Sequence, residues 1–123
     1  LSVHEGPQRI SKAPNNVELK PGMVISNEPG YYKAGKYGIR IENLVAVRRA
    51  TSPLTGLNSD LDNFLCFETL TLAPIDRSLI LKNLLNKEDT QWLNNYHKTV
   101  RNSLEPLVGE EIKEWLQKAT EDI

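Results

Sequence analysis

The stretch GMVISNEPGYYKAGKYGIRIEN, residues 22–43, decides how the rest of the chain is organised. It contains two glutamates, Glu28 and Glu42, and each lies at the end of an apolar run. A connection rich in Gly and Tyr separates the two runs. We predict that the runs form neighbouring strands, which bring both carboxylates and Arg40 into one pocket. Such a set of oxygen ligands suits hard or borderline metal ions.

Apolar and β-branched runs separated by turn residues predict an antiparallel sheet in the first part of the chain. We expect residues 31–37, between the two glutamate-bearing runs, to form a connection in which glycines supply positive φ where it is needed. The predicted strands are Met23–Ser26, Ile39–Arg48 and Phe64–Leu72.

The run Ile39–Arg48 combines charge with strong apolar character. Its first half alternates, so Arg40 and Glu42 point to the same face. Its second half is apolar on both faces, which is typical of a strand in the middle of a sheet. Because an unpaired buried charge is costly, Arg40 and Glu42 need partners or a metal ion there.

The last third of the chain predicts helices. Asp76–Leu85 is expected to form a short helix or turn, and Asn86 is a good N-cap for the helix that follows. Proline and glycine end that helix, and Glu110–Thr120 forms a second one. The apolar stripes consist of Trp92, Leu93, Tyr96, Val100 and Leu104 in the first helix, and of Ile112, Trp115, Leu116 and Ala119 in the second. We interpret both tryptophans as core or interface residues.

The composition of the 123-residue chain is that of one globular domain or part of a larger one. Its formal net charge of -1 gives no electrostatic reason to expect nucleic acid or an anionic membrane as a partner. Cys66 is the single cysteine, which excludes an internal disulfide and metal sites built from several cysteines. A reducing compartment is therefore favoured, and with no apolar run long enough to span a bilayer we expect a cytoplasmic protein.

Each candidate site residue has a simpler explanation beside the functional one. Glu28 and Glu42 are either exposed carboxylates near strand ends or ligands of a shared metal site. His4, in VHEGP, is either an ordinary loop histidine or a hydrogen-bonding and proton-transferring group beside the pocket. Tyr32 is either a packing residue or a phenol placed into the pocket.

Two further residues are interpreted without a chemical role. His97 is predicted to be structural or solvent-facing. Cys66, on a predicted strand, is interpreted as a small core hydrophobe and not as a nucleophile.

Three segments together carry a resemblance to a known family: VHEGPQRIS at residues 3–11, GMVISNEPGYYKAGKYGIRIENLVAV at residues 22–47, and WLNNYH at residues 92–97. They resemble the C-terminal part of aminopeptidase P, the X-Pro aminopeptidase, which is related to methionine aminopeptidases and prolidases of the pita-bread fold. The resemblance implies an α+β fold. Residues 1–74 would be the C-terminal part of the catalytic domain, and residues 75–123 a helical extension. We expect the chain, which enters a motif at once without an initiator Met, to begin inside a larger protein.

The resemblance also implies a dinuclear metal site, usually with Mn²⁺ and alternatively with Zn²⁺ or Co²⁺, bound by two Asp, one His and two Glu. The two Glu fall on Glu28 and Glu42. The other three ligands would lie upstream of Leu1, so the chain by itself is expected to be inactive.

Further site residues are implied by the same resemblance. The histidine of HEGP falls on His4, the arginine of I-R-I-E on Arg40 and the tyrosine after E-P-G-x on Tyr32; these would be catalytic, substrate-side or supporting groups. The implied reaction removes the N-terminal residue from a peptide with proline in second position, the metals activating a water. Glu28 would take the proton from that water.

Three alternatives stay open beside this enzyme. The first is a prolidase-type Xaa-Pro dipeptidase, and the second is a non-catalytic pita-bread module that binds peptides or proteins. The third is an ordinary α+β domain with a surface charge pair. The partners implied are a proline-containing peptide, the rest of the chain's own protein, and a second copy in a homodimer, with Trp92 or Trp115 at the subunit contact.

Overall fold

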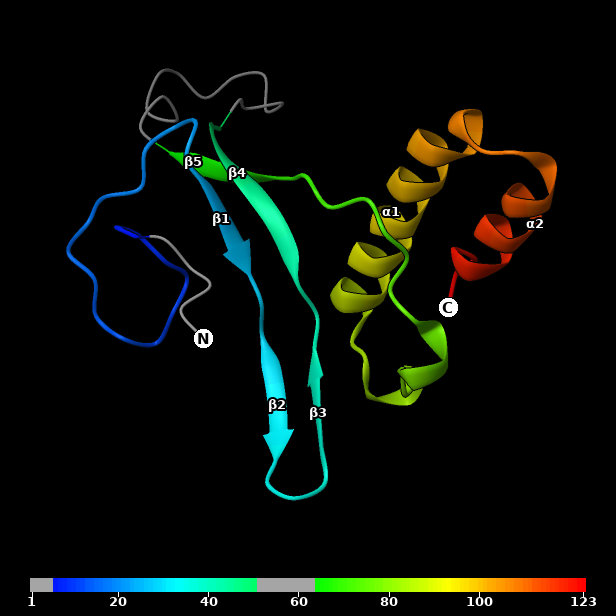
Figure 1. The fold of residues 1–123 in the computed structure, drawn as a ribbon, viewed down its shortest axis with the longest axis horizontal. Coiled ribbons are helices and arrows are strands. Elements are labelled where there is room, and N and C mark those ends of the chain that lie inside the picture. The colour runs from blue at the N-terminus through cyan, green and yellow to red at the C-terminus, as the bar shows by residue number, and fades with distance from the viewer. Residues whose placement is uncertain (1–5, 51–63) are drawn as a thin grey trace. The chain divides into compact units, whose positions relative to one another are not determined.

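The computed structural model describes residues 6–50 and 64–123. The chain divides into two compact units, Leu1–Thr71 and Leu72–Ile123. The strands belong to the first unit and the helices to the second (Figure 1). The sequence places this boundary slightly later, between residues 74 and 75.

A three-stranded antiparallel sheet forms the body of the first unit. Its strand order is β1-β4-β5, so β4 is the central strand, as the sequence predicts. The centre of β4 is buried, and Val47 is 0% exposed, because strands flank β4 on both edges and Leu19 and Met23 pack against its core face. The bounds are Val24–Asn27 for β1, Asn43–Arg49 for β4 and Leu65–Thr69 for β5.

A second antiparallel ladder extends this sheet as a two-stranded hairpin of β2 (Gly30–Lys33) and β3 (Tyr37–Arg40). The prediction that residues 31–37 form only a connection is therefore wrong. Its tyrosines are β-favouring residues and pair across the hairpin, while the turn needs only the residues around Gly35, where φ is +68°. Figure 1 shows β1 continuing into β2 and β3 into β4.

The predicted single strand Ile39–Arg48 is divided in two, because the ladder is interrupted between β3 and β4. Pro29 lies opposite the break between β3 and β4, and it has no N–H to donate to a ladder. Its carbonyl still accepts a hydrogen bond of 3.2 Å from the Ile41 N–H. The register is unchanged across the gap, since Asn27 pairs with Asn43 before it and Gly30 with Arg40 after it.

The core of the first unit lies on one face of the three-stranded sheet. Ile25, Val45 and Val47 form it, with Leu19 and Met23 packed against them. Cys66 is exposed, so its interpretation as a core residue is wrong. Cys66 lies on the outer strand β5 and pairs with Arg48 of β4. The core residue Val47 directly precedes Arg48 along β4, so its side chain points to the opposite face.

The second unit consists of two helices preceded by two 3₁₀ turns within the range predicted to be a short helix or turn. Asn86 caps the first helix as predicted, because its side-chain oxygen accepts a hydrogen bond of 2.8 Å from the Asp89 N–H. Asp76 caps the first 3₁₀ turn through hydrogen bonds from Ser78, which lower the pKa of the Asp76 carboxyl. The bounds are Arg77–Leu79 and Lys82–Leu84 for the 3₁₀ turns, Lys87–Leu104 for α1 and Glu110–Ala119 for α2, with a 3₁₀ turn at Glu105–Leu107 between the helices.

The predicted helical stripes meet in a second core, which contains Tyr96, Val100 and Leu116. The tryptophans are not part of it, since Trp92 is 53% exposed and Trp115 is 58% exposed. Of their two predicted roles, the core role is therefore wrong. No helix in the described ranges has both the length and the apolar character that crossing a bilayer requires.

His97 was predicted to be either structural or solvent-facing, and the structure shows the structural role. It is 0% exposed, and its Nε2 accepts a hydrogen bond of 3.0 Å from the Ile75 N–H. This bond requires a neutral ring with the proton on Nδ1. Burial, and next the positive charge of Arg77, lower the pKa of the His97 imidazole.

Two arginines hold the C-terminal end of α2. Arg77 Nη1 donates to the Lys118 carbonyl at 2.7 Å, and Arg101 Nη1 donates to the Thr120 carbonyl at 3.0 Å. The last carbonyls of a helix have no partner within it and carry partial negative charge, so both contacts stabilise this end.

Candidate metal centre

Glu28 and Glu42 lie opposite each other in the interruption between the two ladders. Glu28 directly follows β1 and Glu42 directly precedes β4, and the register that pairs Asn27 with Asn43 also aligns the two glutamates. The residues that bring them together are thus the ends of neighbouring strands. The prediction that the two runs are adjacent strands is confirmed.

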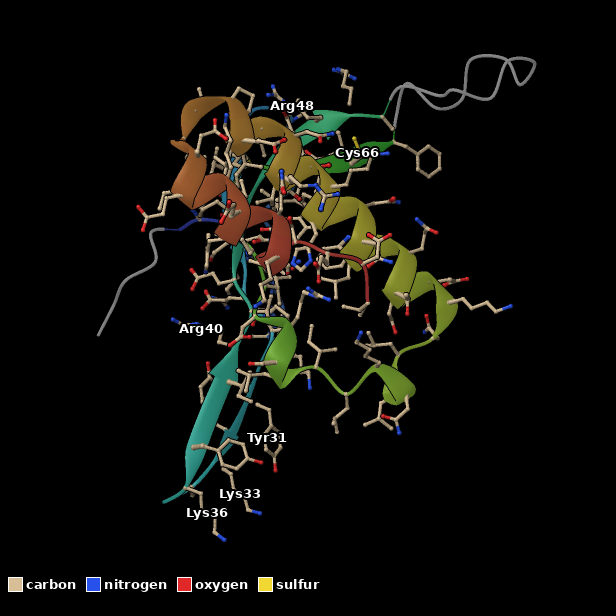
Figure 2. All side chains as sticks on the ribbon, turned by 90° about the vertical axis from the view of Figure 1, so that its right-hand side faces the viewer. Tyr31, Lys33, Lys36, Arg40, Arg48 and Cys66 are labelled. Atoms are coloured by element: carbon tan, nitrogen blue, oxygen red, sulfur yellow. The ribbon has the colours of Figure 1, made fainter. Side chains whose placement is uncertain are left out.

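One guanidinium contacts both carboxylates. Arg40 Nη1 lies 3.3 Å from Glu28 Oε2, and Arg40 Nε lies 3.3 Å from Glu42 Oε2. Figure 2 shows Arg40 at the end of the hairpin away from the turn, whereas Lys36 lies near the turn. Because the Arg40 side chain is 50% exposed, these ion pairs contribute at most about 1 kcal/mol each to folding. Their consequence is orientation, since a rigid fork fixes the position of two acceptors at once.

Glu28 has a second partner that the sequence reasoning missed. Ser26 Oγ donates a hydrogen bond of 3.0 Å to Glu28 Oε1, so each carboxylate oxygen of Glu28 has its own contact. The sequence contains a sign of this contact, because Ser26 lies two residues before Glu28 at the end of a strand. That spacing places both side chains on one face. The Glu28 side chain is 24% exposed and that of Glu42 is 41% exposed. A carboxylate oxygen has two lone pairs, so it can contact a hydrogen-bond donor and a cation at once.

Both glutamates line an open pocket of about 790 Å³. Its apolar wall includes Val24 and Leu44, which are 52% and 47% exposed. The segment from Gln8 to Ser11 forms another wall, and the sequence reasoning assigned it no role there. The pocket therefore combines a carboxylate pair with exposed apolar side chains, which suits a ligand with both polar and apolar parts.

Tyr32 lies beside this site and is not among the residues that line the pocket. It belongs to β2, pairs with Gly38 of β3 and is 65% exposed. In an antiparallel pair, residues directly opposite share a face. Tyr32 and Gly38 therefore lie on the same face of the hairpin as Gly30 and its partner Arg40.

The remaining candidate, His4, lies outside the described residues. Within the described ranges, no group of three or more His, Cys, Asp or Glu side chains is placed to hold a metal ion. The described part of the site is thus the carboxylate pair with Arg40 and Ser26.

The two carboxylates of Glu28 and Glu42 fit a divalent cation as part of its ligand set. Two carboxylates beside one guanidinium carry a net negative formal charge, which attracts a cation. Their oxygens are the ligands that Mn²⁺ and similar ions take in proteins. The contacts from Ser26 and Arg40 are of the kind that orients ligating carboxylates from outside the metal's own shell.

Comparison with family models places the chain in a known class. Residues 1–49 match the model of metallopeptidase family M24, and residues 63–123 match the model of the C-terminal region of peptidase M24. The matches follow one another along the chain and belong to the same family. The chain belongs to metallopeptidase family M24.

Individual relatives are more specific. The chain is 43% identical over 124 residues to aminopeptidase P1 of Lotus japonicus, a match that covers 100% of this chain and 18% of that protein. It is 44% identical over 127 residues to a probable Xaa-Pro aminopeptidase P of Coprinopsis cinerea, covering 100% of this chain and 20% of that protein. The predicted resemblance to aminopeptidase P is confirmed. The chain spans about a fifth of the length of these curated relatives.

The fold has a solved counterpart. The crystal structure of X-prolyl aminopeptidase from Caenorhabditis elegans, described as a cytosolic enzyme with a di-nuclear active site, matches with a TM-score of 0.79 and 38% identity. The match covers 98% of this chain and 20% of that one. The predicted fold class, the C-terminal portion of an α+β pita-bread fold, is confirmed.

Proposed function

We propose that this chain forms the C-terminal part of a dinuclear-metal aminopeptidase, which removes the N-terminal residue from peptides with proline in second position. The observation that carries the proposal is the alignment of Glu28 and Glu42 across the interrupted ladder, where both contact Arg40 and line one pocket. The relatives named aminopeptidase P and X-prolyl aminopeptidase support the substrate class.

In this proposal Glu28 and Glu42 are the metal ligands that the chain contributes. Two divalent ions, Mn²⁺ first and Zn²⁺ or Co²⁺ as alternatives, would supply an activated water and a polarised scissile carbonyl when bound. Arg40 holds both carboxylates in the orientation that ligation requires. Glu28 would take the proton of the attacking water, since a carboxylate can act as a general base.

His4 and Tyr32 are proposed to act on the substrate side. A histidine with a pKa near neutrality is suited to hydrogen bonding or proton transfer beside the scissile bond. The phenol of Tyr32 is suited to a hydrogen bond with the peptide. The apolar wall at Val24 and Leu44 is suited to the proline ring.

We further propose that residues 1–74 complete a catalytic domain whose remaining ligands come from the rest of the protein, and that residues 75–123 are a helical extension. Trp92 or Trp115, both of which are exposed, is proposed to lie at the contact of a homodimer. The protein is proposed to be cytoplasmic, like the cytosolic enzyme from Caenorhabditis elegans.

The test is an activity assay of the purified full-length protein loaded with Mn²⁺. An Xaa-Pro-Pro peptide should lose its first residue, and an Xaa-Pro dipeptide should be cleaved far more slowly. The reverse preference would assign a prolidase-type dipeptidase. A full-length protein that binds the peptide without cleaving it would be the non-catalytic module and would overturn the proposal.

A further inference from the structure

The ring of Tyr32 lies against two glycines, one on each strand of the hairpin. A Cβ atom built on Gly38 would lie 2.6 Å from Tyr32 Cδ1, and one built on Gly30 would lie 2.8 Å from Tyr32 Oη. Both distances are too short for real Cβ contacts. The ring therefore occupies the space that a side chain at either position would take.

Neither glycine is required by its backbone. Positive φ occurs at Gly22 and Gly35, and among the described glycines it does not occur at Gly30 or Gly38. The three heavy atoms nearest to each built Cβ all belong to Tyr32. The local reason for glycine at these two positions is thus the aromatic ring and not the turn.

The direction of the ring connects it to the candidate site. The Cδ1 atom lies over Gly38 and the hydroxyl lies over Gly30, so the side chain runs back along the hairpin, away from its turn. Gly30 pairs with Arg40, whose guanidinium contacts both glutamates. The Tyr32 hydroxyl is therefore directed toward the Arg40 end of the same face.

We infer that Gly30 and Gly38, the glycine pair, are positioning residues that hold the Tyr32 ring flat and present its hydroxyl to peptide at the mouth of the carboxylate pocket. This inference rests on the proposed function. With a methyl group at residue 38, the ring has to rotate away from the strand, and its hydroxyl leaves the Arg40 end. The side chain stays attached and chemically intact, but its hydroxyl is no longer in place.

The experiment is a double-mutant cycle in the full-length protein, with Gly38→Ala, Tyr32→Phe and the two together. For an Xaa-Pro-Pro peptide, kcat/KM should fall roughly three- to tenfold in each single variant, the size expected for one neutral hydrogen bond. The double variant should fall no further than Tyr32→Phe alone, because the displaced group is already missing. Tyr31→Phe, an exposed tyrosine on the opposite face, is the matched control and should leave kcat/KM unchanged.

A second measurement does not depend on activity. In the wild-type protein, nuclear Overhauser contacts should join the Tyr32 ring to the Gly38 Hα atoms, and Gly38→Ala should remove the upfield shift that the ring imposes on residue 38. If the wild type cleaves the peptide and Gly38→Ala moves the ring with no loss of kcat/KM, the inference fails while the proposed function stands. If the wild type cleaves no Xaa-Pro peptide, the proposed function fails, and with it the catalytic meaning of the glycine pair.

Discussion

Arg40 Nη1 lies 3.3 Å from Glu28 Oε2, although Arg40 ends β3 and Glu28 lies between β1 and β2, where the ladder is interrupted. The gap opposite Pro29 removes hydrogen bonds from the sheet, and the side chains on either side of it form the carboxylate pair with its arginine. An interruption of a regular ladder thus leaves room for a site without changing the register.

Replacing Arg40 with Lys is expected to weaken Mn²⁺ binding by the full-length protein roughly 10- to 100-fold, the range measured when groups that support metal ligands are removed. The positive charge is kept, but an ammonium does not hold two carboxylates in the planar fork of a guanidinium. Isothermal titration with Mn²⁺ measures the effect. Arg48→Lys is the matched control, because Arg48 pairs with Glu68 on the same sheet and neither lines the pocket. Equal affinities in both variants would contradict the role of Arg40.

Glu42→Gln is expected to abolish Mn²⁺ occupancy or peptide turnover and to leave the fold intact. The amide keeps the size of the side chain and loses the charge and one ligating oxygen. Metal content after gel filtration, together with a thermal melt, separates loss of the site from unfolding. Glu68→Gln, on the exposed face of β5, should retain metal and activity. Wild-type metal content and turnover in Glu42→Gln would count heavily against the proposed ligand.

The helical unit is expected to lose stability as the pH falls below about 6.5, the ordinary pKa of histidine. Burial, followed by the charge of Arg77, lowers the pKa of His97 in the folded state, and Arg101 adds to this while Asp122 opposes it. Between the two pKa values the unfolded chain binds a proton that the folded chain does not, so the stability is fully present above the unfolded pKa and is lost toward the folded one.

Tryptophan fluorescence during thermal unfolding at pH 7.5 and pH 5.5 measures this dependence, since both tryptophans lie in the helical unit. His97→Gln is the control, because its amide oxygen can still accept the Ile75 N–H and does not titrate. The difference between the two midpoints should be smaller in this variant than in the wild type. An identical pH dependence in both proteins would show that His97 is not its source.

Leu116→Ala is expected to destabilise the helical unit by about 2–5 kcal/mol, because the truncation leaves a cavity in a core where Leu116 is 2% exposed. Ile112→Ala, one turn earlier on α2, is the matched control. Ile112 is 49% exposed, so its loss should cost less than about 1 kcal/mol. Urea unfolding followed by circular dichroism compares them, and equal losses would mean that α2 does not pack as described.

The homodimer is tested at its proposed contact. Trp92→Ala or Trp115→Ala should shift the full-length protein from dimer toward monomer, since buried tryptophans contribute strongly to interfaces. Light scattering over a concentration series measures the mass. Leu107→Ala is the control and should remain dimeric. Leu107 is also exposed but lies on the turn between the helices. A monomeric wild-type protein would rule out the contact.

Several features of the chain were predictable because the information lies within a few residues. The Asn86 cap depends on one side chain and the backbone beside it. The continuous apolar run in the centre of β4 predicts a strand that has neighbours on both edges. The meeting of Glu28 with Glu42 followed from two glutamate-bearing runs joined by a short link, because consecutive strands of this kind usually lie side by side in a sheet.

The sequence by itself determined the central strand, the two C-terminal helices and the meeting of the two carboxylates, since helix caps, alternation and short links act through neighbouring atoms. It did not show the hairpin of β2 and β3. Tertiary structure alone decided that Cys66 faces outward, that His97 accepts the Ile75 N–H, and that Tyr32 lies over Gly38. Each of these depends on which strand or segment lies opposite and which face is covered. No local pattern of residues carries that information, because it arises only when separate elements pack together.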